Sequence, residues 1–118
     1  MIESVMDTGP AAFYFNTRPR NITTSPSNRV EFQCSIHSTF TPNFKWNFTR
    51  KVSREADITA ESGTLSVIYS IAHGRRSQVL IIPSVQWRHD GVYTCIASSE
   101  NSQIKAEANL DVLSKHYE

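Results

Sequence analysis

Apolar and polar residues alternate with a period of two along most of this chain, which restricts it to a fold built from β-strands. The alternation occurs in six segments, at residues 30–36, 44–48, 65–71, 80–82, 93–97 and 104–112. Turn-forming residues such as Pro42, Gly74 and Asn101 separate these segments, and no helical stripe competes with them. With two edge segments near residues 13–17 and 21–24, the sequence predicts an all-β fold, an antiparallel sandwich of two sheets around a core about 10 Å thick.

The length and composition fit a single folded domain. The chain has 118 residues, of which 39% are hydrophobic and 19% are charged. Its net charge of +1 gives no electrostatic reason to expect binding to nucleic acid or to an anionic membrane. The longest apolar run, residues 79–82, is far shorter than the roughly 20 residues of a membrane span. The first ten residues carry acids and no apolar stretch, so they are not expected to act as a signal peptide.

Two cysteines, Cys34 and Cys95, stand 61 residues apart. A zinc site is not expected, because the four histidines are scattered and none forms a closely spaced pair near a cysteine. The separation suits one long-range disulfide, which would stabilise the fold by about 4 kcal/mol in the chain-entropy description. Two buried free thiols are the alternative that the spacing alone leaves open.

Three features at fixed spacing resemble the immunoglobulin domain. Trp46 follows Cys34 by twelve residues, and residues 90–95 read Asp-Gly-Val-Tyr-Thr-Cys. The resemblance implies that Cys34 and Cys95 form a disulfide between the two sheets and that Trp46 packs against it, nearly fully buried. It also implies that Tyr93 forms a tyrosine corner and that Asp90 has a structural role. The short region after Trp46 and the alternating last strand are most similar to the intermediate set (I-set) of cell-adhesion molecules and receptors.

The resemblance also gives the domain limits and the strand letters. The domain is expected at residues 11–113, after an N-terminal linker or remnant at 1–10 and before a C-terminal linker at 114–118. The expected strands are A at 12–17 with A′ at 21–24, B at 30–37, C at 43–49, D at 65–71, E at 78–82, F at 92–98 and G at 103–113.

An enzyme is not expected, and neither is a cofactor or a metal. If both cysteines form the bridge, no thiol nucleophile remains. The four glycines form no phosphate-binding loop, and the Asp90 position usually serves structure in the family that the chain resembles.

Two sequons, at Asn21 and Asn47, make both residues candidate glycosylation sites. Seven asparagines and 25 serines plus threonines would give about 1.5 sequons by chance, so the count alone proves nothing. Asn47 has the opposite parity to Trp46 and is expected to point to solvent.

One outer face is predicted to contact another protein. Leu80 and Ile82 are expected to point inward, so Val79 and Ile81 should point outward. In strand D, residues 65, 67, 69 and 71 are expected inside and Ile68 outside. Ile68, Val79 and Ile81 should then cluster on the outer A-B-E-D face, as a surface for a partner protein or for a second copy of the domain. The alternative is that β-branched residues merely favour strands and need no partner.

The opposite C-F-G face should show Val92, Thr94 and Ile96, with Asn47 beside them. Trp87, in the E–F turn, is a further contact candidate, although such tryptophans often cap the end of a sandwich.

Basic residues in the loops suggest a third type of ligand. Arg50 and Lys51 follow strand C, and Arg75 and Arg76 occupy the D–E turn. If they met in space they would bind heparan sulfate, whereas solvated loop charges are the simpler interpretation.

We therefore expect an extracellular domain of a receptor, an adhesion protein or a secreted protein that recognises another protein. A structural spacer and a heparan-sulfate-binding domain are the alternatives. No nucleic acid is expected as a partner, and a membrane only through the parent chain.

Overall fold

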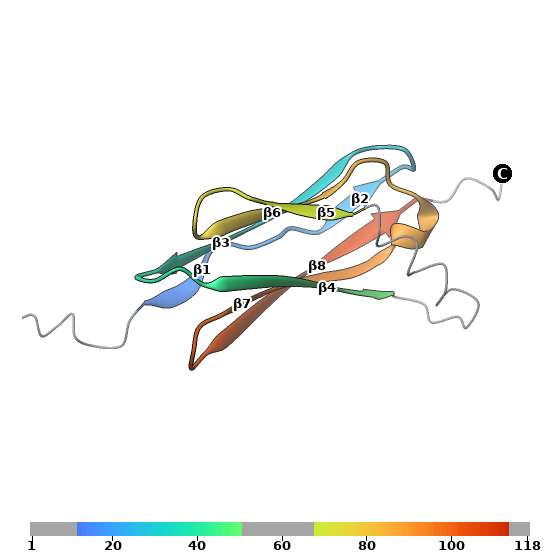
Figure 1. The fold of residues 1–118 in the computed structure, drawn as a ribbon. Helices are drawn as coiled ribbons and strands as arrows, with labels where there is room; N and C mark the ends of the chain where they lie inside the picture. The colour runs from blue at the N-terminus through green and yellow to red at the C-terminus, as the bar shows by residue number, and fades with distance from the viewer. Residues whose placement is uncertain (1–11, 51–67, 114–118) are drawn as a thin grey trace, which may run out of the picture.

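The structure, a computed structural model, describes residues 12–50 and 68–113, which form two four-stranded sheets that face each other (Figure 1). Along the chain the strands are β1 (Phe13–Thr17), β2 (Ile22–Thr24), β3 (Val30–Ser38), β4 (Asn43–Arg50), β5 (Tyr69–Ala72), β6 (Ser77–Ile82), β7 (Gly91–Ser98) and β8 (Gln103–Val112). A short 3-10 helix, η1 (Trp87–His89), precedes β7. The predicted sandwich is confirmed, and the expected linkers at 1–10 and 114–118 lie outside the described residues.

One sheet has the strand order β1-β3-β6-β5 and the other β2-β8-β7-β4. All strand pairs are antiparallel except β2 and β8, which run parallel. The first two strands thus belong to different sheets, although only residues 18–21 separate them. This order matches the A-B-E-D and C-F-G sheets that the sequence predicts, with A′ joined to G.

The core forms where the inward residues of the two sheets meet. Strand β3 shows the predicted alternation most clearly, with Val30, Phe32, Cys34 and Ile36 buried and the polar residues between them more exposed. The ring of Tyr93 lies 5.0 Å from that of Phe32 and 4.8 Å from that of Phe48, measured between centroids. The largest side chains of the core therefore contact one another across the sandwich. The fully buried residues around them include Ile82, Val85, Ala108 and Leu110.

The parity predicted for strand D is wrong. Residues 65–67 lie outside the described residues, but β5 pairs with β6 so that Tyr69 lies opposite Ile81 and Ser70 lies opposite Leu80. Because Leu80 is buried in the core, Ser70 shares the inner face and Tyr69 the outer one. Ile68 packs against the core, contrary to the expectation that it points outward. The turn between β5 and β6 sets this register, and an alternating pattern within one strand does not reveal it.

Candidate functional site

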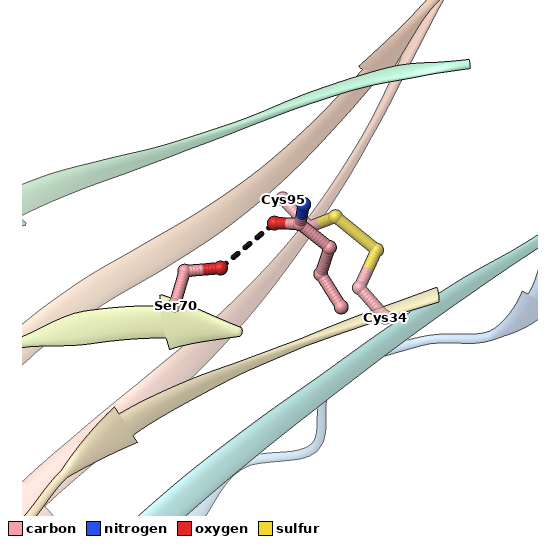
Figure 2. The surroundings of a disulfide bond; sticks show 4 residues. Cys34, Ser70 and Cys95 are labelled. Carbon is pink, nitrogen blue, oxygen red and sulfur yellow. Dashed lines mark hydrogen bonds between the residues drawn. A yellow bond between two sulfur atoms is a disulfide. The ribbon is translucent and has the colours of Figure 1, made fainter. Parts of the chain in front are cut away.

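The two cysteines form the predicted bridge between the sheets. Cys34 on β3 and Cys95 on β7 are joined with an S–S distance of 2.07 Å, and both are fully buried (Figure 2). The chain has no other cysteine. The bridge therefore fixes the two sheets to each other and leaves no thiol for chemistry.

Polar side chains lie close to the bridge on the inner face. Gln78 pairs with Cys34 across β3 and β6, and the hydroxyl of Ser70 donates a 2.7 Å hydrogen bond to Oε1 of Gln78. Figure 2 shows this bond as a dashed line beside the disulfide. The inner face of β5 is thus small and polar at this point.

Trp46 pairs with Cys95 on the neighbouring strand, but its side chain is half-buried and not nearly fully buried as expected. The difference has a structural reason. Trp46 lies on β4, the edge strand of its sheet, and Figure 1 places β5 across from it. Ser70 and Ala72, the inward residues of β5, are too small to cover an indole. The buried Nε1 of Trp46 has no hydrogen-bond partner among the described residues.

A network of hydrogen bonds holds the turn before β7. The hydroxyl of Tyr93 donates to the carbonyl oxygen of His89 at 2.7 Å, the bond that defines a tyrosine corner. Oδ2 of Asp90 accepts the main-chain N–H of Val112 at 2.8 Å, which ties the turn to β8. Nδ1 of His89, which is only 1% exposed, accepts the N–H of Gln86 at 2.8 Å. No role is predicted for His89 from the sequence, in which its position directly before Asp90 and Gly91 is the only sign of one.

The outer face of the β1-β3-β6-β5 sheet differs from the prediction. Tyr69 and Ile71, which were expected inside, are 46% and 48% exposed on this face. Ile81, which was expected to be exposed, is only 2% exposed although it points outward. Val79 is half-buried. Tyr69, Ile71 and Val79 are neighbours on this face, and we call the apolar surface that they form the Tyr69–Ile71 patch.

Neighbouring side chains explain why Ile81 is buried. Ile81 pairs with Glu31 on one side and with Tyr69 on the other, so longer side chains flank it in the plane of the sheet. Glu31 is held in place by Arg29, whose Nε lies 2.9 Å from Oε2 of Glu31. This hydrogen bond raises the pKa of the Arg29 guanidinium, the cation beside the patch.

The outer face of the other sheet is less apolar than its sequence suggests. Ile96 points outward but is buried, because it pairs with Lys45 on one side and with Lys105 on the other. Thr94 is also buried, and Val92 is half-buried. Asn47 is exposed on this face, opposite Thr94.

The second sequon residue takes part in the fold. Asn21 is exposed, and its Oδ1 accepts the main-chain N–H of Asn109 at 2.8 Å. This contact holds the chain against β8 just before β2 begins. Glycosylation of Asn21 and Asn47 stays a prediction.

The basic residues do not converge into one patch. Arg75 and Arg76 lie in the turn between β5 and β6, whereas Arg50 ends β4 at the opposite end of the sandwich, next to η1 (Figure 1). Lys51 lies outside the described residues. The sequence left open whether these two basic groups meet, and the structure places Arg50 and Arg75 apart.

The structure does bring Arg50 to Trp87, although the two residues are far apart in the sequence. Trp87 is 52% exposed, so it does not cap the sandwich by being buried. The guanidinium carbons of Arg50 and Arg88 lie 5.5 Å and 5.7 Å from the centroid of the Trp87 ring. Nη1 of Arg50 also donates a 2.7 Å hydrogen bond to the carbonyl oxygen of Arg88.

Residues 12–50 and 68–113 contain neither a candidate metal site nor a candidate membrane-spanning helix. No three His, Cys, Asp or Glu side chains in these ranges are grouped so that they could hold a metal ion. No helix in the same ranges is long and apolar enough to cross a membrane.

Comparisons with known proteins agree with this architecture. The solved titin M3 domain is 18% identical, with a TM-score of 0.69 over 89% of this chain and 100% of that one. The complex of titin M10 with an obscurin-like 1 Ig domain is 18% identical, with a TM-score of 0.69 over 90% of this chain and 98% of that one. The titin domains Z1Z2 in complex with telethonin are 19% identical, with a TM-score of 0.70 over 90% of this chain and 49% of that one. At this identity the likeness shows the fold alone, and no curated protein matches the sequence.

The match to a family is more extensive. The family model of the immunoglobulin I-set domain matches residues 13–112. This range covers most of the chain and includes both cysteines, Trp46 and Tyr93. The chain therefore belongs to the immunoglobulin I-set domain family.

Proposed function

We propose that this I-set domain is a protein-recognition domain of an extracellular protein and that it pairs with a second copy of itself through the Tyr69–Ile71 patch. The exposure of Tyr69 and Ile71 on an outer sheet face is the observation that carries the proposal. Strands favour such residues in any case, but two large apolar side chains that are nearly half exposed next to each other on one face favour a contact.

The charges beside the patch support a symmetric partner. Arg29 and Glu31 border the patch and carry opposite charges. In a two-fold arrangement, Arg29 of one copy can approach Glu31 of the other, so the same face is complementary to itself.

The extracellular location rests on the disulfide. A buried bridge between the sheets forms and persists in an oxidising compartment, whereas cytosolic thiols are kept reduced. The absence of a thiol nucleophile also fits a role in binding and not in catalysis, as is common for sandwiches of this family.

The test of pairing is the molar mass in solution as concentration rises. We expect the wild-type domain to approach twice its monomer mass and Ile71→Arg to stay monomeric, because the charged side chain would be buried without a partner. Gln103→Arg adds the same charge at an exposed position of the other sheet and should dimerise normally. A wild-type domain that stays monomeric at millimolar concentration, or an Ile71→Arg variant that dimerises normally, would refute pairing through this patch.

A spacer role is the second candidate, and the structural neighbours favour it. Several of them are arrays, such as the titin tandem domains A164-A165 and a three-domain fragment of titin. A domain of this type could act mainly by holding its neighbours at a fixed distance. A chain that neither self-associates nor contacts a partner through any described face, but keeps its stability, would support this candidate.

Heparan-sulfate binding stays a prediction with weaker support. Arg75 and Arg50 lie at opposite ends of the sandwich, so each end would bind a sulfated chain separately. The salt concentration that elutes the domain from a heparin column, compared between wild type and Arg75→Gln, tests this interpretation.

A further inference from the structure

The end of the sandwich next to η1 carries an exposed aromatic ring with two cations beside it. Trp87 is contacted by the guanidinium groups of Arg50 and Arg88, at 5.5 Å and 5.7 Å from the ring centroid. Cation–π contacts at these distances are attractive. We call this group, consisting of Arg50, Trp87 and Arg88, the Arg–Trp–Arg cluster.

Three separate parts of the fold hold the cluster in place. Arg50 is the last residue of β4 and pairs with Gly91, the first residue of β7. Its Nη1 bonds to the carbonyl of Arg88, so strand and helix are tied together directly. The main-chain N–H of Asp90 closes η1 by donating to the carbonyl of Trp87 at 3.2 Å.

Contacts of the buried residue His89 also hold the turn that carries Trp87 and Arg88. His89 is buried, its Nδ1 accepts the N–H of Gln86, and its main-chain carbonyl accepts the hydroxyl of Tyr93. Trp87 and Arg88 are therefore presented by a turn that is fixed to the core on both sides. A ring held in this way loses little conformational entropy when a ligand binds to it.

A role in capping the end of the sandwich does not account for the exposure of Trp87. A tryptophan that caps a sandwich contributes through burial, yet just over half of this side chain stays accessible. Arg88 makes no ion pair with any residue in 12–50 or 68–113. Tryptophan and arginine are the residues most enriched in the centres of protein-binding surfaces.

The charges of the cluster define the type of ligand. A guanidinium group binds a carboxylate through two parallel hydrogen bonds, and a flat aromatic ring binds apolar groups beside it. The nearby carboxylate of Asp90 is directed into the fold, where Oδ2 accepts the N–H of Val112. This hydrogen bond ties Asp90 to β8.

A protein segment fits the cluster better than a sulfated glycan does. Binding to a glycosaminoglycan depends on several cations along one surface. Here two guanidinium groups lie beside one ring, while Arg75 and Arg76 lie at the far end of the sandwich. We propose that the Arg–Trp–Arg cluster binds an acidic peptide segment of a partner protein, with a carboxylate against Arg88 and an apolar group against the Trp87 ring.

This site is separate from the Tyr69–Ile71 patch. The patch lies on the outer face of one sheet, whereas the cluster lies at an end of the sandwich, between β4 of the other sheet and η1. If the domain does not self-associate, the proposal of an acidic-peptide site still stands. If the peptide does not bind, the proposal of self-association through the Tyr69–Ile71 patch still stands.

The experiment is a titration of the isotope-labelled domain with a ten-residue peptide of alternating Glu and Phe, followed by NMR. The side-chain N–H signal of Trp87 is identified by its loss in Trp87→Ala. We expect a saturable shift of this signal and of the main-chain signals of η1. In Arg88→Gln the dissociation constant should rise about tenfold, because a charge-assisted hydrogen bond is lost.

The controls are chosen to separate charge, position and ligand class. Arg75→Gln removes the same charge at the opposite end and should bind the peptide like the wild type. A peptide with Gln in place of Glu should bind much more weakly. The proposal is overturned if no saturable shift occurs at millimolar peptide, if Arg88→Gln binds as tightly as the wild type, or if only a heparin oligosaccharide shifts the Trp87 signal.

Discussion

The hydroxyl of Tyr93 donates a 2.7 Å hydrogen bond to the main-chain carbonyl of His89, which connects the start of β7 to the end of η1. Both residues are buried, at 0% and 1% exposure, so water cannot replace this bond if it is lost. The same bond determines how Trp87 and Arg88 are presented at the surface.

Tyr93→Phe removes only this hydroxyl and keeps the ring packed against Phe32 and Phe48. We expect a loss of about 1–3 kcal/mol in the free energy of unfolding, because the buried carbonyl of His89 loses the hydrogen bond from this hydroxyl. Urea denaturation measures the change. Tyr14→Phe is the matched control, since Tyr14 is 55% exposed, and it should change stability little. Equal stability of the two variants would contradict the role given to the buried bond.

Gly91→Ala should destabilise the domain by about 2–4 kcal/mol. A Cβ at this position would lie 2.5 Å from the carbonyl oxygen of Thr49 and 2.6 Å from Cε1 of Phe48, so main chain of the neighbouring strand would have to move.

The comparison for Gly91 is Gly74→Ala in the turn between β5 and β6. There a Cβ meets nothing within 4 Å, but φ is +90°, a region that only glycine adopts easily. We expect a smaller loss of about 1 kcal/mol. Thermal denaturation of both variants should rank Gly91→Ala clearly below Gly74→Ala, and the opposite order would mean that β4 and β7 are less closely packed than described.

Reduction of the Cys34–Cys95 bridge should cost the domain about 4 kcal/mol, the value expected for a loop that spans 61 residues. Urea denaturation with and without a reducing agent measures this difference. Free-thiol titration of the folded, oxidised protein should find no thiol, because the chain has only these two cysteines. Detection of two thiols would show that the sheets are held by packing alone.

A pair of substitutions tests which residues of the outer sheet face are covered. Ile81→Glu should lower the free energy of unfolding by more than about 3 kcal/mol, because the new carboxylate would be buried under Glu31 and Tyr69. Ile71→Glu, on the same face but 48% exposed, should stay within about 0.5 kcal/mol of the wild type. Chemical denaturation of the monomer at low concentration gives both values. Similar effects of the two substitutions would contradict the register of β5 against β6.

The sequence predicts the sandwich well because its strongest signals are local or are fixed by chemistry. The alternation in β3 needs only one buried face, and the pairing of two cysteines follows from the family pattern. The parity of β5 could not be predicted in the same way. Its inward residues, Ser70 and Ala72, are less apolar than its outward ones, so the pattern within the strand points to the wrong face.

Burial on the outer faces and the grouping at η1 also depend on contacts between distant segments. Ile81 and Ile96 are covered by side chains of the strands beside them, which a single strand does not reveal. Arg50 and Trp87 are 37 positions apart and meet only because β4 ends where η1 begins. A tryptophan in the predicted E–F turn was the sequence signal at this end of the domain.

Because β1 and β2 are edge strands of different sheets, the loss of both would expose an edge of each sheet. Strand β1 covers the free edge of β3, and β2 covers the free edge of β8, so one short N-terminal stretch protects both sheets. A proteolytic cut after Thr24 would release this protection in two places at once. It would uncover the main-chain donors and acceptors of a nine-residue and a ten-residue strand, which are surfaces on which other chains can add a strand and aggregate.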